Sequence, residues 1–295
     1  MSETPAGHPP VLGVIGGSGV YAIEGLEDAR WRAVESPFGA PSDEFLCGTL
    51  EGQPVVFLPR HGRGHPIPPS ELNFRANIDA LKRLGVTEIV SVSAVGSLRE
   101  DLEPGKFVLV DQYIDRTYAR IKTFFGPGLA GHVSMADPVC RRLNGHLEAA
   151  CTELGIPHRL GGTYLAMEGP QFSSRAESKL YRSWGCHVIG MTNMPEAKLA
   201  REAEICYASV AMVTDYDCWR DDRGHVTVDE VLRVLLENAD KARALVQRVA
   251  PALTERRGSC EAGCHRALDT AIITQPDARD PDLVARLDAV AGRVL

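Results

Sequence analysis

The chain has 295 residues, a hydrophobic fraction of 44%, a formal net charge of −7 and an isoelectric point near 5.7. This length permits one large α/β domain or two small ones, and the apolar content is enough for a sizeable core. The acidic balance disfavours nucleic acid and anionic membranes as partners, because both reward a basic surface.

The N-terminal segment and the cysteines favour a soluble, cytoplasmic protein. Residues 1–10 are polar and contain prolines, without the apolar stretch of a signal peptide. No apolar run approaches the ~20 residues of a membrane span. The eight cysteines are scattered, unlike those of a small disulfide scaffold. Cys260, Cys264 and His265 make only a weak zinc site, so we expect no metal and either reduced or reversibly paired thiols.

The first strand, at residues 11–15, is followed by a glycine-rich turn from Gly16 to Gly19. Such a turn lets backbone N–H groups approach an anion, and Ser18 adds a hydroxyl. The turn loosely matches a dinucleotide-binding fingerprint, but that fingerprint needs a long helix next, and the following residues leave room for little more than a turn. We therefore predict a phosphate cradle, with a glycine turn that binds no ligand as the alternative.

A basic loop follows a predicted hairpin of strands at residues 44–50 and 54–58. The loop contains Arg60 and His61. Arginine presents a planar fork suited to phosphate oxygens, and histidine adds a donor. A solvated loop is the alternative, but a basic cluster at a strand end of an acidic chain favours an anion site.

The middle of the chain alternates strands and helices. Helices are expected at residues 73–84 and 137–154, the second with Asp137 as its N-cap. Strands are expected at residues 87–93, 107–110, 159–167 and 187–191. Residues 114–136 fit no regular element and predict a long functional loop.

Two further segments follow predicted strands. Ser174 and Glu177 form a capping box that starts a helix. Phe172, just before it, is either a hydrophobic staple or a stacking face for a flat ligand. Pro195 opens another helix, which runs to Glu204.

An acid pair ends the buried strand at residues 207–213. If the strand geometry persists, Asp215 and Asp217 face one pocket, because side chains two apart on an extended chain point the same way. Two acids held close cannot both ionise easily, so one should have a raised pKa and act as a proton donor. A helix-capping acid beside a solvated loop acid is the alternative.

The remainder of the chain indicates one domain. A long amphipathic helix follows, and the composition changes after Leu253. We expect a flexible N-terminus at residues 1–10, an α/β domain at 11–253 and a C-terminal extension at 254–295 that packs on the body or on a neighbouring subunit.

Five predicted strand ends carry small, hydroxyl or charged residues that can converge on one cleft. One part of that cleft suits an oxyanion, another offers carboxylates, and Phe172 offers a flat apolar wall. Phosphorolysis of a purine N-glycosidic bond needs this arrangement, because phosphate is the nucleophile and the leaving base requires a proton.

Six motifs resemble, in order and spacing, the 5′-methylthioadenosine phosphorylases of the trimeric purine nucleoside phosphorylase family. The resemblance covers about residues 10–250, and its motifs are residues 16–19, 60–62, 96–99, 168–172, 191–196 and 214–219. It implies a single α/β domain with a central mixed sheet flanked by helices. It also implies a homotrimer, or a hexamer built from two trimers, and no cofactor beyond inorganic phosphate as co-substrate.

The resemblance also implies roles for individual residues. Phosphate would be held by Ser18, Arg60, His61, Ser93, Ala94 and Thr192. Met191 would lie against the ribose, and Phe172 and Ser173 would line the base site. Asp215 would face purine N7, with Asp217 near the 6-amino group. His132 would reach a neighbour's 5′ pocket.

The reaction implied is phosphorolysis of 5′-methylthioadenosine, and alternatives stay open. The two aspartates favour adenine, because a carboxylate accepts from a 6-amino group. The relatives that act on 6-oxopurines resemble each other in having an asparagine there instead. A broader 6-aminopurine or 6-oxopurine nucleoside phosphorylase is the alternative, since Asn193, Met194 and the C-terminal tail depart from the eukaryotic pattern. The cationic loop disfavours a hydrolytic nucleosidase, because water needs no cationic clamp. The acid pair disfavours a nucleoside-binding protein, which gains nothing from a proton donor. The short glycine turn disfavours an NAD-dependent enzyme.

Overall fold

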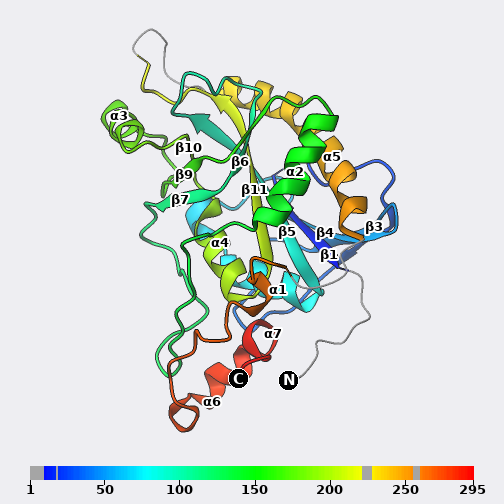
Figure 1. Ribbon diagram of the computed structural model, residues 1–295, viewed down its shortest axis with the longest axis vertical. Coiled ribbons are helices and arrows are strands. Elements are labelled where there is room, and N and C mark those ends of the chain that lie inside the picture. The colour runs from blue at the N-terminus through cyan, green and yellow to red at the C-terminus, as the bar shows by residue number, and fades with distance from the viewer. Residues whose placement is uncertain (1–9, 18, 221–227, 255–259) are drawn as a thin grey trace.

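The computed structural model describes residues 10–17, 19–220, 228–254 and 260–295 (Figure 1). Its strands are β1 (Val11–Gly16), β2 (Glu27–Arg32), β3 (Phe45–Leu50), β4 (Gln53–Pro59), β5 (Val86–Ser97), β6 (Phe107–Val110), β7 (Gln112–Asp115), β8 (His158–Leu160), β9 (Thr163–Ala166), β10 (Val188–Gly190) and β11 (Cys206–Asp215). Its α-helices are α1 (Phe74–Arg83), α2 (Arg141–Glu153), α3 (Arg175–Ser183), α4 (Asn193–Glu202), α5 (Val228–Thr254), α6 (Pro281–Arg286) and α7 (Asp288–Ala291). None of the described helices combines the length and apolarity that a membrane span requires.

The described strands join into one mixed sheet with helices on both faces, which confirms the predicted fold class. The strands β4, β1, β5 and β11 run parallel to one another at its centre, whereas β10 runs antiparallel to β5. One apolar cluster includes residues of α1, α4 and α7, and the other includes residues of α2 and α5. Side chains of β11 alternate between them, with Ala211 and Val213 in the first and Val210 and Met212 in the second. A parallel strand covered on both faces reads as a continuous apolar run for this reason.

One edge of the central strand β5 is shared by two strands, β1 and β10, with a gap between them. β11 pairs with β5 from Glu88 to Gly96 along one edge. On the other edge, β1 pairs with β5 only as far as Ser91, and β10 joins at Gly96. Between these two ladders, residues 92–95 have no strand partner on that edge among the described strands. A gap of this kind at the end of a parallel strand is where α/β sheets bind ligands.

Two predicted elements differ from the structure for local reasons. The helix expected from Asp137 begins at Arg141, because Cys140 has an extended backbone and its N–H donates to the Tyr207 carbonyl of β11 at 2.8 Å. The strand expected at residues 159–167 is divided into β8 and β9, since the chain turns at Gly161 with a positive φ of 79°. The edge strand β2 was not predicted, because its residues are mostly exposed and backbone pairing with β3 holds it in place.

The C-terminal segment packs beside α1 and along the long loop at residues 116–136 (Figure 1). Its Leu268 and Val290 lie in the apolar cluster of α1 and α4. Gly131 of the loop forms a β-bridge with Ile272, and the His132 N–H donates to the Ala271 carbonyl at 2.9 Å. The backbone of the C-terminal segment therefore helps to position the loop.

Candidate active site

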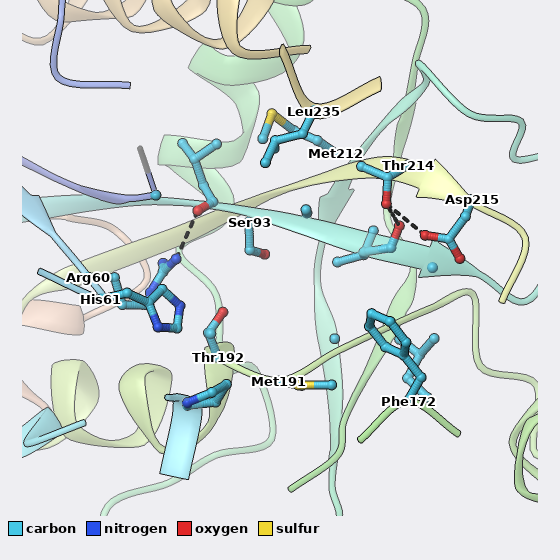
Figure 2. A pocket seen from close by; sticks show the side chains of 18 of the residues that line it. Arg60, His61, Ser93, Phe172, Met191, Thr192, Met212, Thr214, Asp215 and Leu235 are labelled. Atoms are coloured by element: carbon cyan, nitrogen blue, oxygen red, sulfur yellow. Dashed lines mark hydrogen bonds between the residues drawn. The ribbon is translucent and has the colours of Figure 1, made fainter. Parts of the chain in front are cut away.

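A cavity of about 530 Å³ lies against the open edge of β5 (Figure 2). Nine of the twelve predicted site residues line it: Arg60, His61, Ser93, Ala94, Phe172, Met191, Thr192, Asp215 and Asp217. They converge because β4, β5 and β11 are parallel and end near one another, while β10 runs back toward the gap in β5. Figure 2 shows Arg60, His61 and Thr192 toward one end and Phe172 and Asp215 toward the other, with Met191 between them.

Two hydroxyl groups at the first end lack partners. Ser93 and Thr192 are each 7% exposed, and their hydroxyl oxygens have no hydrogen-bond partner among the described residues. The buried Tyr164 hydroxyl lies close to both but outside hydrogen-bond geometry. Leaving a buried hydroxyl unpaired costs about 1–3 kcal/mol, so two of them in one cavity indicate a polar ligand.

Arg60 lies at the same end, and most of its N–H donors are used in hydrogen bonds within the protein. Its Nε donates to Oε2 of the buried Glu196 at 2.9 Å, and Nη2 donates to the Ser91 hydroxyl at 2.6 Å. Nη1 donates to the Val92 carbonyl at 3.0 Å, which lies on the open edge of β5. Although burial opposes the charge, Glu196 raises the pKa of Arg60, so the guanidinium stays charged. Among the described residues, one Nη1 hydrogen keeps no acceptor, and this is the donor that Arg60 can offer to a ligand.

His61 lies beside Arg60 as a neutral imidazole. Burial and then the charge of Arg60 lower the pKa of His61 to about 4. Its Nδ1 lies 2.8 Å from the Ile67 carbonyl, which selects the tautomer with the proton on Nδ1. The ring stacks on His65 with centroids 4.1 Å apart, and His65 also lines the cavity. The other basic residue of the loop, Arg63, pairs with Asp43 instead, at 2.8 Å.

The two aspartates at the far end of the cavity have different environments. Asp215 is the last residue of β11, and its carboxylate accepts from the Thr214 hydroxyl and from the Asp217 N–H, both at 2.7 Å. Asp217 lies beyond the strand with a positive φ of 52°, so the predicted strand geometry does not persist. Its carboxylate accepts from the Ser178 hydroxyl. Burial, with a further contribution from the charge of Asp215, raises the pKa of Asp217 to about 6.

The acid pair needs space that a glycine provides. A Cβ on Gly96 would lie 3.1 Å from Asp215 Oδ1 and 3.2 Å from Asp217 Cβ. Those separations are tighter than ordinary contacts, so a side chain at this point of β5 would displace the carboxylates.

The walls between the two ends are apolar. Met167, Met191, Val20 and Leu235 line the cavity, and Phe172 closes one side of it. Phe172 is 52% exposed, so it is not packed as a hydrophobic staple. Leu235 belongs to α5, so this helix contributes to the cavity together with the sheet.

A buried ion pair holds the segment that carries Met191 and Thr192. Arg120 Nη1 donates to the carbonyls of Met191 and Met194, and Nε donates to Glu168 Oε1 at 3.1 Å. Burial opposes the Glu168 charge, but hydrogen bonds led by that of Ser70 lower the pKa of Glu168 to about 2. The carboxylate therefore stays ionised and fixes Arg120 against the turn after β10.

Of the other three predicted site residues, the two that the structure describes, Ser173 and His132, do not line this cavity. Ser18 lies outside the described residues. The carbonyl of the half-buried Ser173 accepts from the Cys218 thiol at 3.1 Å, and its hydroxyl donates to Sδ of Met167, a lining residue, at 3.7 Å. His132 is exposed on the long loop, away from the cavity of its own chain.

Sequence reasoning missed several residues that organise the site. Glu196 ends the motif at residues 191–196, but nothing in that motif indicates its pairing with Arg60, 136 residues away. No local pattern marks Ser178, which lies on α3 and bonds Asp217. Thr214 was visible beside the acid pair, and its position at the strand end was the available signal. Of the ion pair between Arg120 and Glu168, only Glu168 is marked in the sequence, because it directly follows a predicted strand.

Comparison with known proteins identifies the family. The family model described as the phosphorylase superfamily matches residues 11–251. The chain is 66% identical over 295 residues to the S-methyl-5′-thioadenosine phosphorylase of Rhodospirillum rubrum, with both chains fully covered. It is similar to the crystal structure of a methylthioadenosine phosphorylase from an antarctic soil metagenomic library, with 45% identity, a TM-score of 0.90, and 96% and 99% of the two chains covered. The Schistosoma mansoni methylthioadenosine phosphorylase in complex with adenine is 37% identical, with a TM-score of 0.80 and coverage of 84% and 93%.

The Rhodospirillum rubrum relative covers the whole chain, and the antarctic soil structure shares its fold over 96% of the chain. The chain therefore belongs to the phosphorylase superfamily and, within it, to the S-methyl-5′-thioadenosine phosphorylases.

Proposed function

We propose that the protein catalyses the reversible phosphorolysis of 5′-methylthioadenosine to adenine and 5-methylthioribose 1-phosphate. One observation carries the proposal: a single cavity has unpaired hydroxyls at one end and an acid pair at the other. The apolar stretch between them suits a sugar and a flat base. The relatives, whose names state this activity, support the choice of substrate.

Phosphate occupies the end formed by Ser93, Ala94 and Thr192. The two hydroxyls and the backbone N–H of Ala94 donate to its oxygens, and Arg60 adds its remaining N–H. Ser18, in the glycine-rich turn, completes this set. Because His61 carries its proton on Nδ1, its Nε2 accepts the hydroxyl hydrogen of a protonated phosphate. This aligns an unprotonated phosphate oxygen with the sugar.

The chemistry consists of one bond formed and one bond broken. A phosphate oxygen attacks C1′ of the sugar, which lies against Met191, as the bond from C1′ to purine N9 breaks. The electron pair of that bond stays with adenine, and a proton delivered to N7 neutralises it. Asp215 donates this proton, while the carboxylate of Asp217 accepts from the 6-amino group. Phe172 and Ser173 line the base site.

Thr214 allows the proton to reside on either aspartate. Its hydroxyl has one hydrogen and lies 2.7 Å from Asp215 Oδ2 and 3.2 Å from the Val95 carbonyl. When it donates to Asp215, that carboxylate is stabilised as an anion and the proton resides on Asp217. When it donates to Val95, Asp215 can carry the proton toward N7. The 6-amino group of the bound purine favours the second arrangement, since it requires an ionised Asp217.

The active site is completed by a neighbouring subunit in a homotrimer, or in a hexamer of two trimers. His132 supports this part of the proposal, because it is exposed and lies outside the cavity of its own chain. It would enter the 5′ pocket of the neighbour and contact the methylthio group. No cofactor takes part beyond inorganic phosphate as co-substrate.

A comparison of three nucleosides at saturating phosphate tests the substrate. We expect the highest kcat/KM for 5′-methylthioadenosine, a lower value for adenosine, and a value for inosine lower by roughly a thousandfold or more, since a 6-oxo group leaves the Asp217 carboxylate without a donor. Product analysis by phosphorus NMR should show a sugar 1-phosphate. Comparable rates for inosine would support a broader purine nucleoside phosphorylase instead.

A further inference from the structure

Four buried cysteines from three separate parts of the chain meet at one point, remote from the residues that line the cavity. They are Cys140, Cys206, Cys260 and Cys264, and their Sγ atoms all lie within 4.8 Å of one another. The Cys140 and Cys260 sulfurs are 3.5 Å apart. Only Cys260 and Cys264 are close in sequence, so the fold supplies the second pair that the sequence did not reveal.

Backbone hydrogen bonds hold each pair in place. Cys140 directly precedes α2 and Cys206 begins β11, and the Cys140 N–H donates to the carbonyl of Tyr207 at 2.8 Å. Cys260 and Cys264 flank a turn in which the Gly263 N–H donates to the Cys260 carbonyl at 2.8 Å. Gly263 has a positive φ of 67°, which lets the turn bring both thiols to the same side.

The spacing of the sulfurs fits a tetrahedral metal site. With Zn–S bonds of about 2.3 Å, the sulfurs of a tetrahedral site lie roughly 3.8 Å apart, whereas the sulfurs of a disulfide are about 2 Å apart. The observed separations agree with the first arrangement, and all four cysteines are free thiols. The spacing of Cys260 and Cys264 also lies within the range common among zinc-binding pairs.

Two arginines beside the cluster provide the charge that such a site needs. Four thiolates around Zn²⁺ leave two net negative charges, which are costly to bury without partners. Arg201 Nη1 donates to Cys264 Sγ at 3.5 Å. Arg142, in the first turn of α2, lies near the Cys206 sulfur, and its Nη2 donates to Oε1 of the buried Glu88. Thiols that served only as small apolar side chains would gain nothing from these cations.

We propose that Cys140, Cys206, Cys260 and Cys264 bind one Zn²⁺ ion in a closed structural site. With four protein ligands the ion has no open position, so it takes no part in the reaction. It ties the start of the C-terminal segment to the start of β11 and to α2. That segment then reaches the loop of His132 through the hydrogen bond between His132 and Ala271. The site thus anchors the part of the chain that supports the loop.

Metal analysis of the full-length protein, purified without a metal-affinity step, tests the proposal. We expect about one zinc per chain, or one Co²⁺ per chain after metal exchange, with the intense sulfur-to-cobalt charge-transfer absorption of a tetrahedral thiolate site. Cys260→Ser and Cys264→Ser should lose the metal. Cys151→Ala should keep it, because Cys151 is a buried cysteine of α2 outside the cluster.

Two further measurements separate loss of metal from failure to fold. Cys264→His should retain one metal ion with weaker charge-transfer absorption, since histidine replaces one thiolate ligand. Chelation of zinc from the unmodified protein should lower Tm by roughly 5–10 °C, and added Zn²⁺ should restore it. The proposal fails if the chain contains iron, if intact mass shows two disulfides among these cysteines, or if neither Zn²⁺ nor Co²⁺ binds to the reduced protein.

Discussion

Arg60 and Glu196 are 136 residues apart in the chain and form a two-pronged ion pair beneath the cavity, with Nε–Oε2 at 2.9 Å and Nη2–Oε1 at 3.3 Å. Both side chains are almost fully buried. The same guanidinium bonds the carbonyls of Ile15 and Val92, so it joins β1 to the open edge of β5. Arg60 is therefore both a structural tie between strands and a donor to the proposed phosphate.

Arg60→Ala should destabilise the protein by about 3–5 kcal/mol, because it leaves the Glu196 carboxylate buried and unpaired. Denaturant unfolding monitored by fluorescence measures this change. The double variant Arg60→Ala/Glu196→Ala should recover part of the loss, since no unpaired charge remains. His61→Ala is the adjacent control, and it should weaken phosphate binding with a much smaller change in stability. An Arg60→Ala variant as stable as the parent would contradict the structural role.

Ser93→Ala and Thr192→Val should each raise KM for phosphate by roughly 10-fold to 100-fold, since a hydrogen bond to a charged group contributes about 1.5–3 kcal/mol. The KM for the nucleoside should change little. Neither variant should lose stability, because each removes a hydroxyl that is unpaired in the ligand-free protein. Ser97→Ala is the matched control on the same strand, because the Ser97 hydroxyl donates to the Arg99 carbonyl and does not line the cavity. Equal phosphate KM values for all three variants would place the phosphate elsewhere.

Asp215→Asn should lower kcat by at least roughly 100-fold, because the amide keeps the shape of the side chain and loses the proton donor. Thr214→Val should give a smaller loss, mainly in kcat, since it removes the hydroxyl that moves between Asp215 and Val95. Steady-state kinetics with 5′-methylthioadenosine measures both. Turnover near the parent value in Asp215→Asn would sink the assignment of the proton donor.

The pH dependence of kcat/KM should reveal the proton held by the acid pair. Burial raises the pKa of Asp217 from an ordinary value near 3.8 to about 6, so the free enzyme holds this proton below that pH. Activity that requires this proton is therefore present below about pH 6 and falls as the pH rises through about 6. Asp217→Asn should remove this decline. The ratio of parent to variant activity at each pH cancels the ionisation of phosphate, and a ratio independent of pH would show that the pair does not supply the proton.

The sequence predicted the fold class and the convergence of the strand ends, because both follow from local apolar runs and the residues after them. It placed nine site residues in one cavity for the same reason. It could not show that Arg60 is mostly occupied by Glu196, since that pairing depends on how α4 packs under the sheet. The left-handed backbone at Asp217 and the meeting of Cys140 and Cys206 with the C-terminal cysteines likewise arise from tertiary packing. The strand periodicity that suggested the acid pair ends at Asp215, two residues before Asp217.

The most direct test of the central claim is the release of adenine from 5′-methylthioadenosine in phosphate-free buffer, followed by addition of phosphate. The unpaired hydroxyls of Ser93 and Thr192 predict that release begins only when phosphate is added, with one sugar 1-phosphate formed for each adenine. Release at the same rate without phosphate would mean that water is the nucleophile and that the hydroxyl end of the cavity binds something else.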